Sequence, residues 1–599
     1  MPELHDQLQR RAQRLNRFQQ HQQQRLEWAF NARLATAGFF LFLMILATLA
    51  PKLHLELPTL LIGPPLFIAF AVRSQKIQKA IKKLAALQLF YQRQAQRRRG
   101  IPVDTGIKLA VPPWALTHPL NRDLDILGEH SLFNLIDETL TQEGGERLIK
   151  ALLNPGLSPA QLENRQNNIK SLTQFVGPMR RIVVEGHTQN LHRSLAGLRQ
   201  TLLNPIVGPT FRRDYRILLA LYGLLWINLV LGGLALPNLP ASWLWLGFAL
   251  FSLARLQQTG KSFTRGQDLS LSIAPWSTIF ARLENLQKSA AWPHPLLNQL
   301  AHHRPARHFA ILDRWLTFLS VQSHPLVLIL LNVLAPWNFV FSHLLERQRQ
   351  KLATGIDDCL GDLHEFEVLQ SFAFVATYQP TQFPEFVEPQ AMRLEQIYHP
   401  LLPREKIIAN TFSWQEGQQI ALITGSNMSG KSTFLRAVGL HQVMALAGAP
   451  AFALTPTKAA PLNVVSSMRV ADSVEKGYSS FYAEVRSVKD ILDRAQHEQL
   501  LFLIDEIFSG TNSRERFIGS YSVLTALLRT QSYGFISTHD LELTQMGPDG
   551  KIANWHFRED IENEKMVFRY QLLPGPCPTT NALRVMQMAG LEITHPETT

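Results

Sequence analysis

One loop constrains the fold of this chain more than any other feature. Residues 419–424 read as a strand, "TGSNMSGKST" (424–433) as a loop, and the residues that follow as a helix. Gly425 and Gly430 fit the pattern G-x-x-x-x-G-K-[ST], in the strand–loop–helix context that a phosphate-binding loop requires. Glycines let backbone N–H groups close around phosphates, and the helix N-terminus adds its positive end. We therefore expect a nucleotide-binding α/β domain.

The residue types in this loop predict its chemistry. Lys431 is expected to supply a cation to the β- and γ-phosphates, and the hydroxyl of Ser432 is expected to bind Mg²⁺. The predicted ATP-binding residues form one continuous run: Gly425, Ser426, Asn427, Met428, Ser429, Gly430, Lys431, Ser432 and Thr433.

Two further strand ends are expected to complete the site. "QLLFLIDEIFSGTNSRER" (499–516) contains an apolar strand that ends in Asp505 and Glu506. Asp505 is predicted to hold Mg²⁺, and Glu506 to polarise the attacking water. "YGFISTHDLEL" (533–543) ends another strand at His539, which we expect near the γ-phosphate; taken alone, it could equally be a polar strand end. The sequence thus predicts a Mg²⁺-dependent ATPase with Glu506 and His539 as catalytic residues.

The first half of the chain has a different character. Residues 34–51 and 57–72 are apolar runs, each short for a membrane span, bracketed by Arg33 and Arg73. Residues 73–99 carry nine Lys or Arg and no acid, which by the positive-inside rule places both ends of this hairpin in the cytoplasm.

A second apolar block is longer. No residue from 217 to 254 is charged, and "LPNLPAS" (236–242) interrupts the run, so two spans joined by a turn are expected; a pair of buried core helices is the alternative. A third uncharged stretch, 324–345, precedes the phosphate-binding loop. Because ATP is cytosolic, the number of spans before residue 424 should be even, so we expect four spans and interpret 324–345 as a buried helix of a soluble domain.

The net charge and the cysteine content limit the kinds of partner and metal site that the chain can have. The formal net charge of +12 favours an anionic partner, either nucleic acid or the anionic face of a membrane. The two cysteines, Cys359 and Cys577, are far apart and lack metal-ligand spacing, which excludes a disulfide framework and a zinc finger.

The motifs together resemble the MutS family of ABC-type ATPases. "TGSNMSGKSTFLRAV" is similar to the phosphate loop of that family, "DEIFSGTNSRE" to its Walker B segment and "STHD" to its Thr-His motif. "RVADSVEKGYSSFYAEV" (469–485) resembles the family's signature segment, with Asp472, Gly477, Ser479 and Glu484 at the matching positions. Upstream, "YHPLL" (398–402) and Asn410 resemble the entry to the ATPase domain, and residues 130–172 resemble the helical core.

The resemblance implies a head-to-tail homodimer in which Ser479 of one subunit reaches the γ-phosphate held by Lys431 of the other. The alternative for Ser479 is that it caps its own helix. The resemblance also implies helical arms that clamp DNA. Three departures stand against a standard member: no mismatch-reading domain is recognised before residue 117, the apolar block at 217–254 interrupts the lever region, and "NSRERF" replaces the usual acidic-Gly pair.

The expected fold is an α/β P-loop ATPase domain of ABC/MutS type at the C-terminus, joined to an all-α core and lever region with two transmembrane helical hairpins. The expected function is that of a membrane-anchored ATPase that uses ATP and Mg²⁺ and couples them to DNA binding, in a role related to mismatch repair or recombination. The chain is expected to cross the inner membrane several times, with its ATPase domain in the cytoplasm. The alternative is a nucleotide-driven membrane machine for transport or signalling, with lipids but no DNA as partner. The expected segments are a cytosolic amphipathic helix (1–33), transmembrane hairpin 1 (34–73), a basic linker (74–116), a MutS-like core (117–210), transmembrane hairpin 2 (211–258), a core/lever region (259–395) and the ATPase domain (396–599).

Overall fold

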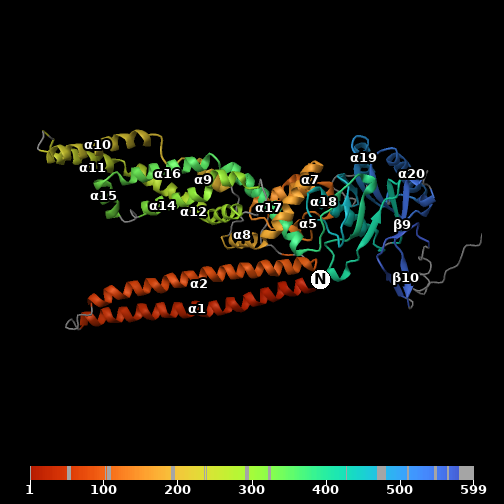
Figure 1. The fold of residues 1–599 in the computed structure, drawn as a ribbon, viewed down its shortest axis with the longest axis horizontal. Helices are drawn as coiled ribbons and strands as arrows, with labels where there is room; N and C mark the ends of the chain where they lie inside the picture. Colours follow the sequence, from red (N-terminus) through yellow and green to blue (C-terminus); the bar gives the residue numbers. More distant parts are fainter. Residues whose placement is uncertain are drawn as a thin grey trace, which may run out of the picture. The chain divides into compact units, whose positions relative to one another are not determined.

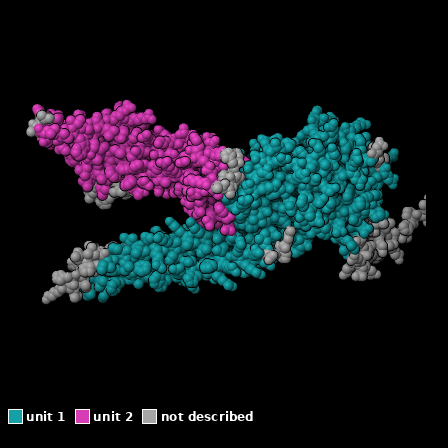
Figure 2. Space-filling view, in the orientation of Figure 1, with its two compact units in different colours: residues 1–138, 146–176, 369–599 teal, residues 139–145, 177–368 magenta. Residues whose placement is uncertain are grey.

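The structure, a computed structural model, forms two compact units (Figure 2). Unit 1 comprises residues 1–138, 146–176 and 369–599, and unit 2 comprises residues 139–145 and 177–368. The residues that the structure describes are 2–49, 56–101, 103, 109–189, 196–234, 237, 239–289, 296–320, 325–426, 428–468, 480–508, 511–545, 550–562 and 565–578.

A six-stranded sheet forms the centre of the C-terminal part of unit 1 (Figure 1). Its strand order is β12-β9-β4-β8-β7-β6, and all neighbours are parallel except the antiparallel edge pair β12–β9. The strands are β4 (Ile420–Thr424), β6 (Asn463–Ser467), β7 (Leu500–Asp505), β8 (Tyr533–Thr538), β9 (Ile552–His556) and β12 (Leu573–Pro574).

Helices cover both faces of this sheet, which explains why its central strands are almost wholly apolar. Ile420 and Leu422 of β4 pack into one core with side chains of α19 (Ser480–Ala495) and α20 (Ser513–Leu528). The opposite face is covered by α18 (Lys431–Leu446), where Gly439 lies so close to β7 that a Cβ there would meet the Leu503 side chain at 2.8 Å. The α/β domain predicted at the C-terminus is therefore present.

Smaller elements complete the described part of unit 1. A second sheet has the order β1-β5-β2-β3, and β10 and β11 form an antiparallel hairpin. The strands are β1 (Glu385–Phe386), β2 (Arg393–Ile397), β3 (Asn410–Ser413), β5 (Lys458–Ala459), β10 (Glu559–Glu562) and β11 (Lys565–Phe568). The short helices are α3 (Pro113–Leu116), α4 (Pro119–Leu124), α5 (Leu132–Ile136), α7 (Pro159–Leu172), η2 (Thr173–Phe175), η4 (Pro389–Ala391), η5 (Arg404–Lys406) and η7 (Leu541–Gln545).

The chain begins with two long helices, α1 (Pro2–Leu49) and α2 (Glu56–Arg98), which run side by side as an antiparallel N-terminal hairpin (Figure 1). Trp28 packs on Phe70 with ring centroids 6.2 Å apart, and Leu8 and Ala29 are buried in the seam. The predicted boundaries at 33/34 and 73/74 therefore fall inside continuous helices. The change from polar to apolar composition along them does not interrupt the helix.

The N-terminal hairpin is anchored at its foot by a buried ion pair. Arg97 pairs with Glu138, and Gln94 donates to the same carboxylate at 2.6 Å. Burial raises the pKa of Glu138, and the nearby Arg97 opposes that rise. These contacts join the foot of the hairpin to the core of unit 1, and removing one partner would leave a buried charge uncompensated.

Unit 2 is helical in its described residues. Its helices are α8 (Val176–Thr188), α9 (Ala196–Leu203), α10 (Phe211–Gly233), α11 (Ala241–Ala254), α12 (Leu256–Gln287), α13 (Asn298–His303), α14 (Pro305–Ser320), α15 (Pro325–Leu334) and α16 (Trp337–Ala353). Helices α6 (Gln142–Leu153) and α17 (Ile356–Tyr378) contribute residues to both units, and α8 has its first residue in unit 1. Its main packing joins α12 to α14, α16 and α9, and α10 to α11.

The structure supports the membrane predictions only in part. Among the described residues, α10 alone is long and apolar enough to cross a membrane as one helix, and α11 is a shorter apolar helix. Two complete membrane hairpins therefore remain a prediction. The expectation of one buried helix over 324–345 is wrong: α15 and α16 meet at a bend of 87°, and Leu330 of α15 is 57% exposed. Pro336 follows the last turn of α15, and a proline cannot continue the hydrogen bonding of a helix.

Candidate active site

The parallel sheet gathers the predicted site residues at one edge. Strands β4, β7 and β8 are neighbours, and they end at Thr424, Asp505 and Thr538 respectively. Because parallel strands end at the same edge of a sheet, the phosphate-binding loop, the Asp505–Glu506 pair and His539 follow one another in space. Each motif is positioned by the strand that precedes it: the phosphate-binding loop by β4, the Asp505–Glu506 pair by β7 and His539 by β8.

The loop has the backbone shape that its glycines allow. Gly425 has φ +145°, and a Cβ there would meet the Phe557 carbonyl oxygen at 2.4 Å. Gly430 has φ +115° and immediately precedes the first turn of α18. Met428 has φ +66° and an exposed side chain, and Asn427 lies outside the described residues. Ser432 is half-buried and Thr433 is exposed. The loop therefore leads into the N-terminus of a sixteen-residue helix, as phosphate binding requires.

Lys431 is buried at the centre of the site. Its Nζ donates to the carbonyl oxygens of Gly425 and Ser426, each at 3.0 Å. Burial lowers the pKa of Lys431, and the charges of Glu506 and Asp505 oppose that shift. The lysine is thus held among carbonyls and carboxylates beside the loop.

Glu506 and His539 form a direct pair. The Nε2 of His539 lies 2.8 Å from a carboxylate oxygen of Glu506 and 3.3 Å from the Lys431 Nζ. Since an ionised carboxylate can only accept a hydrogen bond, Nε2 carries a proton and donates it to Glu506, and the Lys431 ammonium lies beside this bond. This hydrogen bond lowers the pKa of Glu506, partly offset by burial, so the carboxylate stays charged.

Ser537 holds both acidic residues, and sequence reasoning missed it. Its hydroxyl donates to Asp505 and accepts from the Glu506 backbone N–H at 3.0 Å. Glu506 has φ +56°, a conformation that non-glycine residues rarely adopt, so these contacts fix a strained turn at the strand end. Ser537 lies on β8, two residues before His539. Because side chains alternate between the two faces of a strand, residues two apart share a face, and this spacing was the signal that could have pointed to Ser537.

Glu559 is a second residue that the sequence did not reveal. It is buried, and its carboxylate accepts a hydrogen bond from the Ser426 hydroxyl at 2.6 Å. The contact links residues 133 positions apart, and no motif surrounds Glu559 in the sequence. An acidic side chain therefore touches the phosphate-binding loop from β10.

Another acidic residue, Glu484, connects the signature segment to the loop after β7. Its carboxylate accepts from the Phe508 backbone N–H, and Phe481 packs edge-on against the Phe508 ring. Asp472, Gly477 and Ser479 lie outside the described residues. The structure therefore places only the helical end of the signature segment, in the first turn of α19.

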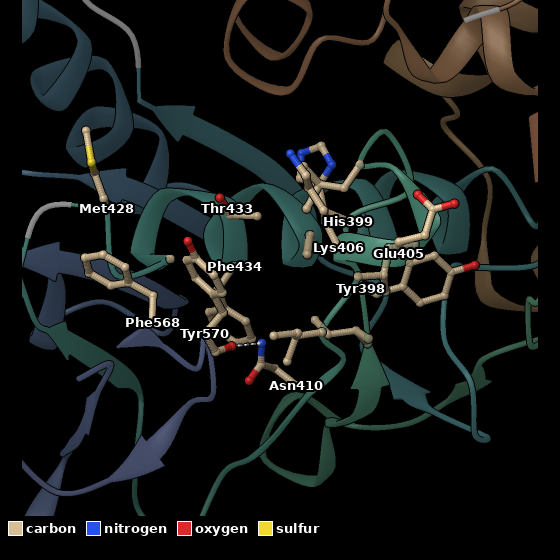
Figure 3. Close-up of a pocket in the computed structure, with 16 residues that line it drawn as sticks. Tyr398, His399, Glu405, Lys406, Asn410, Met428, Thr433, Phe434, Phe568 and Tyr570 are labelled. Carbon is tan, nitrogen blue, oxygen red and sulfur yellow. Dashed lines mark hydrogen bonds between the residues drawn. The ribbon is translucent and has the colours of Figure 1, made fainter. Parts of the chain in front are cut away.

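A cavity of about 640 Å³ opens beside the phosphate-binding loop (Figure 3). Gly430, Thr433 and Phe434 line one side, and Tyr398, His399 and Lys406 come from the segment that follows β2. The remaining lining residues include Glu405, Asn410, Met428, Phe568 and Tyr570. Burial lowers the pKa of His399 to about 4, so its ring is neutral near pH 7.

Asn410 fixes the aromatic wall of this cavity. Its Nδ2 donates to the Tyr570 carbonyl at 3.1 Å, and its Oδ1 accepts from the Leu572 N–H at 2.7 Å. Tyr570 stacks on Phe568 with ring centroids 5.9 Å apart. One amide thus holds a segment 160 residues away, with two aromatic rings, against the nucleotide side of the domain.

A parallel sheet with a glycine-rich loop, a buried lysine and an Asp-Glu strand end defines a P-loop ATPase domain. Residues 421–595 match the family model described as MutS domain V, which is the ABC-like ATPase domain of the MutS family. The chain therefore carries a MutS-type ATPase domain, and the match supports membership of the MutS family.

Proposed function

We propose that this chain is a membrane-anchored, Mg²⁺-dependent ATPase of MutS type that works as a head-to-tail dimer and couples ATP to DNA binding. The observation that carries the proposal is the convergence of Lys431, Glu506 and His539 within hydrogen-bonding reach at the carboxyl edge of the sheet. Such an edge is where ligands bind in open α/β sheets.

The residues of the loop fit a triphosphate. Ser429 has a buried hydroxyl that has no hydrogen-bond partner among the described residues, and the loop lies before the N-terminus of α18. The Lys431 ammonium, now bonded to two backbone carbonyls, is placed to exchange them for phosphate oxygens. We infer that Gly425 to Thr433 bind the phosphates through backbone N–H groups, as the run of glycine and hydroxyl residues supports.

The donors present also fit Mg²⁺. This ion takes one or two protein ligands and completes its shell with phosphate oxygens and water. Ser432 and Asp505 would supply those two ligands, with Asp505 held by Ser537. The described residues contain no cluster of three His, Cys, Asp or Glu side chains that could form an all-protein metal cage. A metal shared with the nucleotide is the chemistry these donors support; when bound, it would neutralise charge on the phosphates.

Glu506 is the group proposed to orient the attacking water. Its pKa is lowered by the hydrogen bond from His539, so it remains an acceptor for a water proton at neutral pH. His539 holds the carboxylate through its Nε2–H and lies beside Lys431, where we expect charge to develop on the γ-phosphate.

The cavity of Figure 3 is proposed to hold the nucleoside part of ATP. It borders the loop at Gly430 and Thr433, and its volume and mixed lining suit a base and ribose. Tyr570 and Phe568 offer ring faces for stacking on the base.

A dimer is proposed because a single subunit leaves the γ-phosphate partly open to solvent, where charge stabilisation is weak. Ser479 of the second subunit is the residue proposed to close it. A mixing experiment tests this: Lys431→Ala and Ser479→Ala subunits should each be nearly inactive alone. A mixed dimer holds one site with both lesions and one with neither, so part of the activity should return. If mixing restores nothing although dimers form, the shared site is refuted.

DNA is the proposed substrate because of the MutS-type domain and the net charge of +12. The second candidate is a membrane machine with no DNA substrate, and the apolar exposed surface of α10 favours a membrane role in either case. Binding of duplex, mismatched and branched DNA to the detergent-purified protein separates the two. Affinity that falls steeply with salt, together with ATP turnover that responds to DNA, supports the first. Turnover indifferent to DNA supports the second.

A further inference from the structure

Helix α15 presents apolar side chains that no described part of unit 2 covers. Ile329, Leu330 and Leu334 are 47%, 57% and 53% exposed, although the helix sequence is PLVLILLNVL. No Asp, Glu, Lys or Arg occurs from residue 315 to residue 345. A row of leucine and isoleucine without flanking charge is unfavourable against water, so this face requires an apolar neighbour.

Asn332 pairs several polar groups at the end of α15 within the protein. Asn332 is buried at the last turn, where its Nδ2 donates to the Leu328 carbonyl and its Oδ1 accepts from the Asn338 N–H at 3.1 Å. The Ser252 hydroxyl of α11 donates to the Asn332 carbonyl at 2.9 Å. A broken helix that faces lipid needs its freed backbone groups paired within the protein, and these bonds pair the Asn332 carbonyl and the Asn338 N–H at the bend.

The exposed face of α15 adjoins that of the α10–α11 pair. Helices α11 and α15 pack on each other, and Ser252 joins them. Leu250 of α11 and Ile227 of α10 are 59% and 58% exposed. At the base of the pair, Arg212, Arg213 and Arg216 lie near the start of α10 and Arg255 follows α11, with Asp214 as the acidic residue among them. Basic residues at one end of an apolar surface match the anionic headgroups of a bilayer.

The length of α15 suits a half-span. Ten residues rise about 15 Å, half of the ~30 Å hydrocarbon core. An 87° bend separates α15 from α16. Helices α14 and α16, which precede and follow α15 in the chain, pack on each other, with the Trp315 and Phe341 ring centroids 5.6 Å apart, so the chain approaches and leaves α15 on the same side. Such a segment adds no crossing, which keeps the number of spans before the phosphate-binding loop even and the ATPase domain in the cytoplasm.

We propose that α15 is a re-entrant membrane helix whose exposed face lies against lipid acyl chains, beside α10 and α11. The inference rests on the membrane anchoring in the proposed function. It adds a membrane contact for a segment that the even number of spans had assigned to the soluble part.

Site-directed spin labelling of the full chain in phosphatidylethanolamine/phosphatidylglycerol nanodiscs tests the proposal. Cys359 and Cys577 are first replaced by serine, and ATP turnover confirms that the protein remains active. Single cysteines then carry a nitroxide at position 330 on α15, at 227 on α10, and at 271 on α12, where Leu271 is 75% exposed and provides a matched leucine control. Collision with oxygen reports lipid exposure, and collision with a water-soluble nickel complex reports water.

The expected result is that labels at 330 and 227 collide mainly with oxygen, whereas the label at 271 collides mainly with nickel. A water-exposed label at 330 with a lipid-exposed label at 227 overturns the re-entrant helix but leaves the membrane anchoring intact. A label at 330 shielded from both reagents also overturns it, because a second copy or another protein then covers α15. Water exposure at both 330 and 227 refutes the anchoring and the inference together.

Discussion

Asn410→Ala is the sharpest test of the nucleoside cavity. The substitution removes both hydrogen bonds that hold the Tyr570–Leu572 segment against the domain. A net hydrogen bond contributes roughly 0.5–1.5 kcal/mol, and both bonds here are partly solvent-exposed, so the loss is about 1–2 kcal/mol in total. If the base stacks on the wall that these bonds fix, the ATP dissociation constant should rise about 5- to 30-fold, since 1.4 kcal/mol corresponds to a factor of ten.

The assay compares two ligands by isothermal titration calorimetry. ATP reaches both the loop and the cavity, whereas inorganic tripolyphosphate reaches only the loop. Asn410→Ala should weaken ATP and leave tripolyphosphate unchanged. Gln418→Ala is a matched control, because that half-buried amide accepts a hydrogen bond from the Gln415 N–H and does not line the cavity. Equal weakening of both ligands, or unchanged ATP affinity, would refute the assignment of the cavity to the nucleoside.

Three further predictions concern catalysis and topology. Glu506→Gln should keep ATP binding but lower turnover by at least ~100-fold, the scale of losing a general base. Wild-type-like turnover in this variant would remove Glu506 from the mechanism. Lys431→Ala, by contrast, should mainly weaken nucleotide binding. His539→Ala removes the hydrogen bond that lowers the pKa of Glu506, so its pKa should rise and the acid limb of the pH–turnover profile should move to higher pH; a profile that shifts the other way contradicts the pairing. Reporter fusions should place residues 53–56 and 237–240 outside and the C-terminus inside, and a C-terminus reporting from the outer side would overturn the four-span topology.

The sequence was sufficient for the part of the site that lies at strand ends. Lys431, Asp505 and His539 were predictable because each follows a recognisable strand, and parallel strands bring their carboxyl ends together. Asn410 and Glu559 were not assigned these contacts, because their partners lie more than 130 residues away along the chain and no local pattern encodes such pairings.

Two features of the helical part show a different limit. The change of composition near residue 33 was interpreted as a boundary, but helix formation depends on local propensity and packing, and α1 continues through it. The parity argument for 324–345 counted only complete crossings. A helix that ends at Leu334, before Pro336, and whose flanking helices lie on the same side satisfies the same count, so parity could not exclude it.

The N-terminal hairpin has the geometry of a long arm whose foot lies against a residue that lines the proposed nucleoside cavity. At the foot of α2, Gly100 has φ +67°, and a Cβ there would meet the Leu402 carbonyl oxygen at 2.2 Å; Leu402 itself lines the cavity of Figure 3. The forty-eight residues of α1 extend about 72 Å from this end. A rotation of about 5° at the foot therefore displaces the far end by ~6 Å for an arm of that length. A rearrangement around a bound nucleotide that rotated this foot would therefore be amplified to several ångströms at the apolar tip.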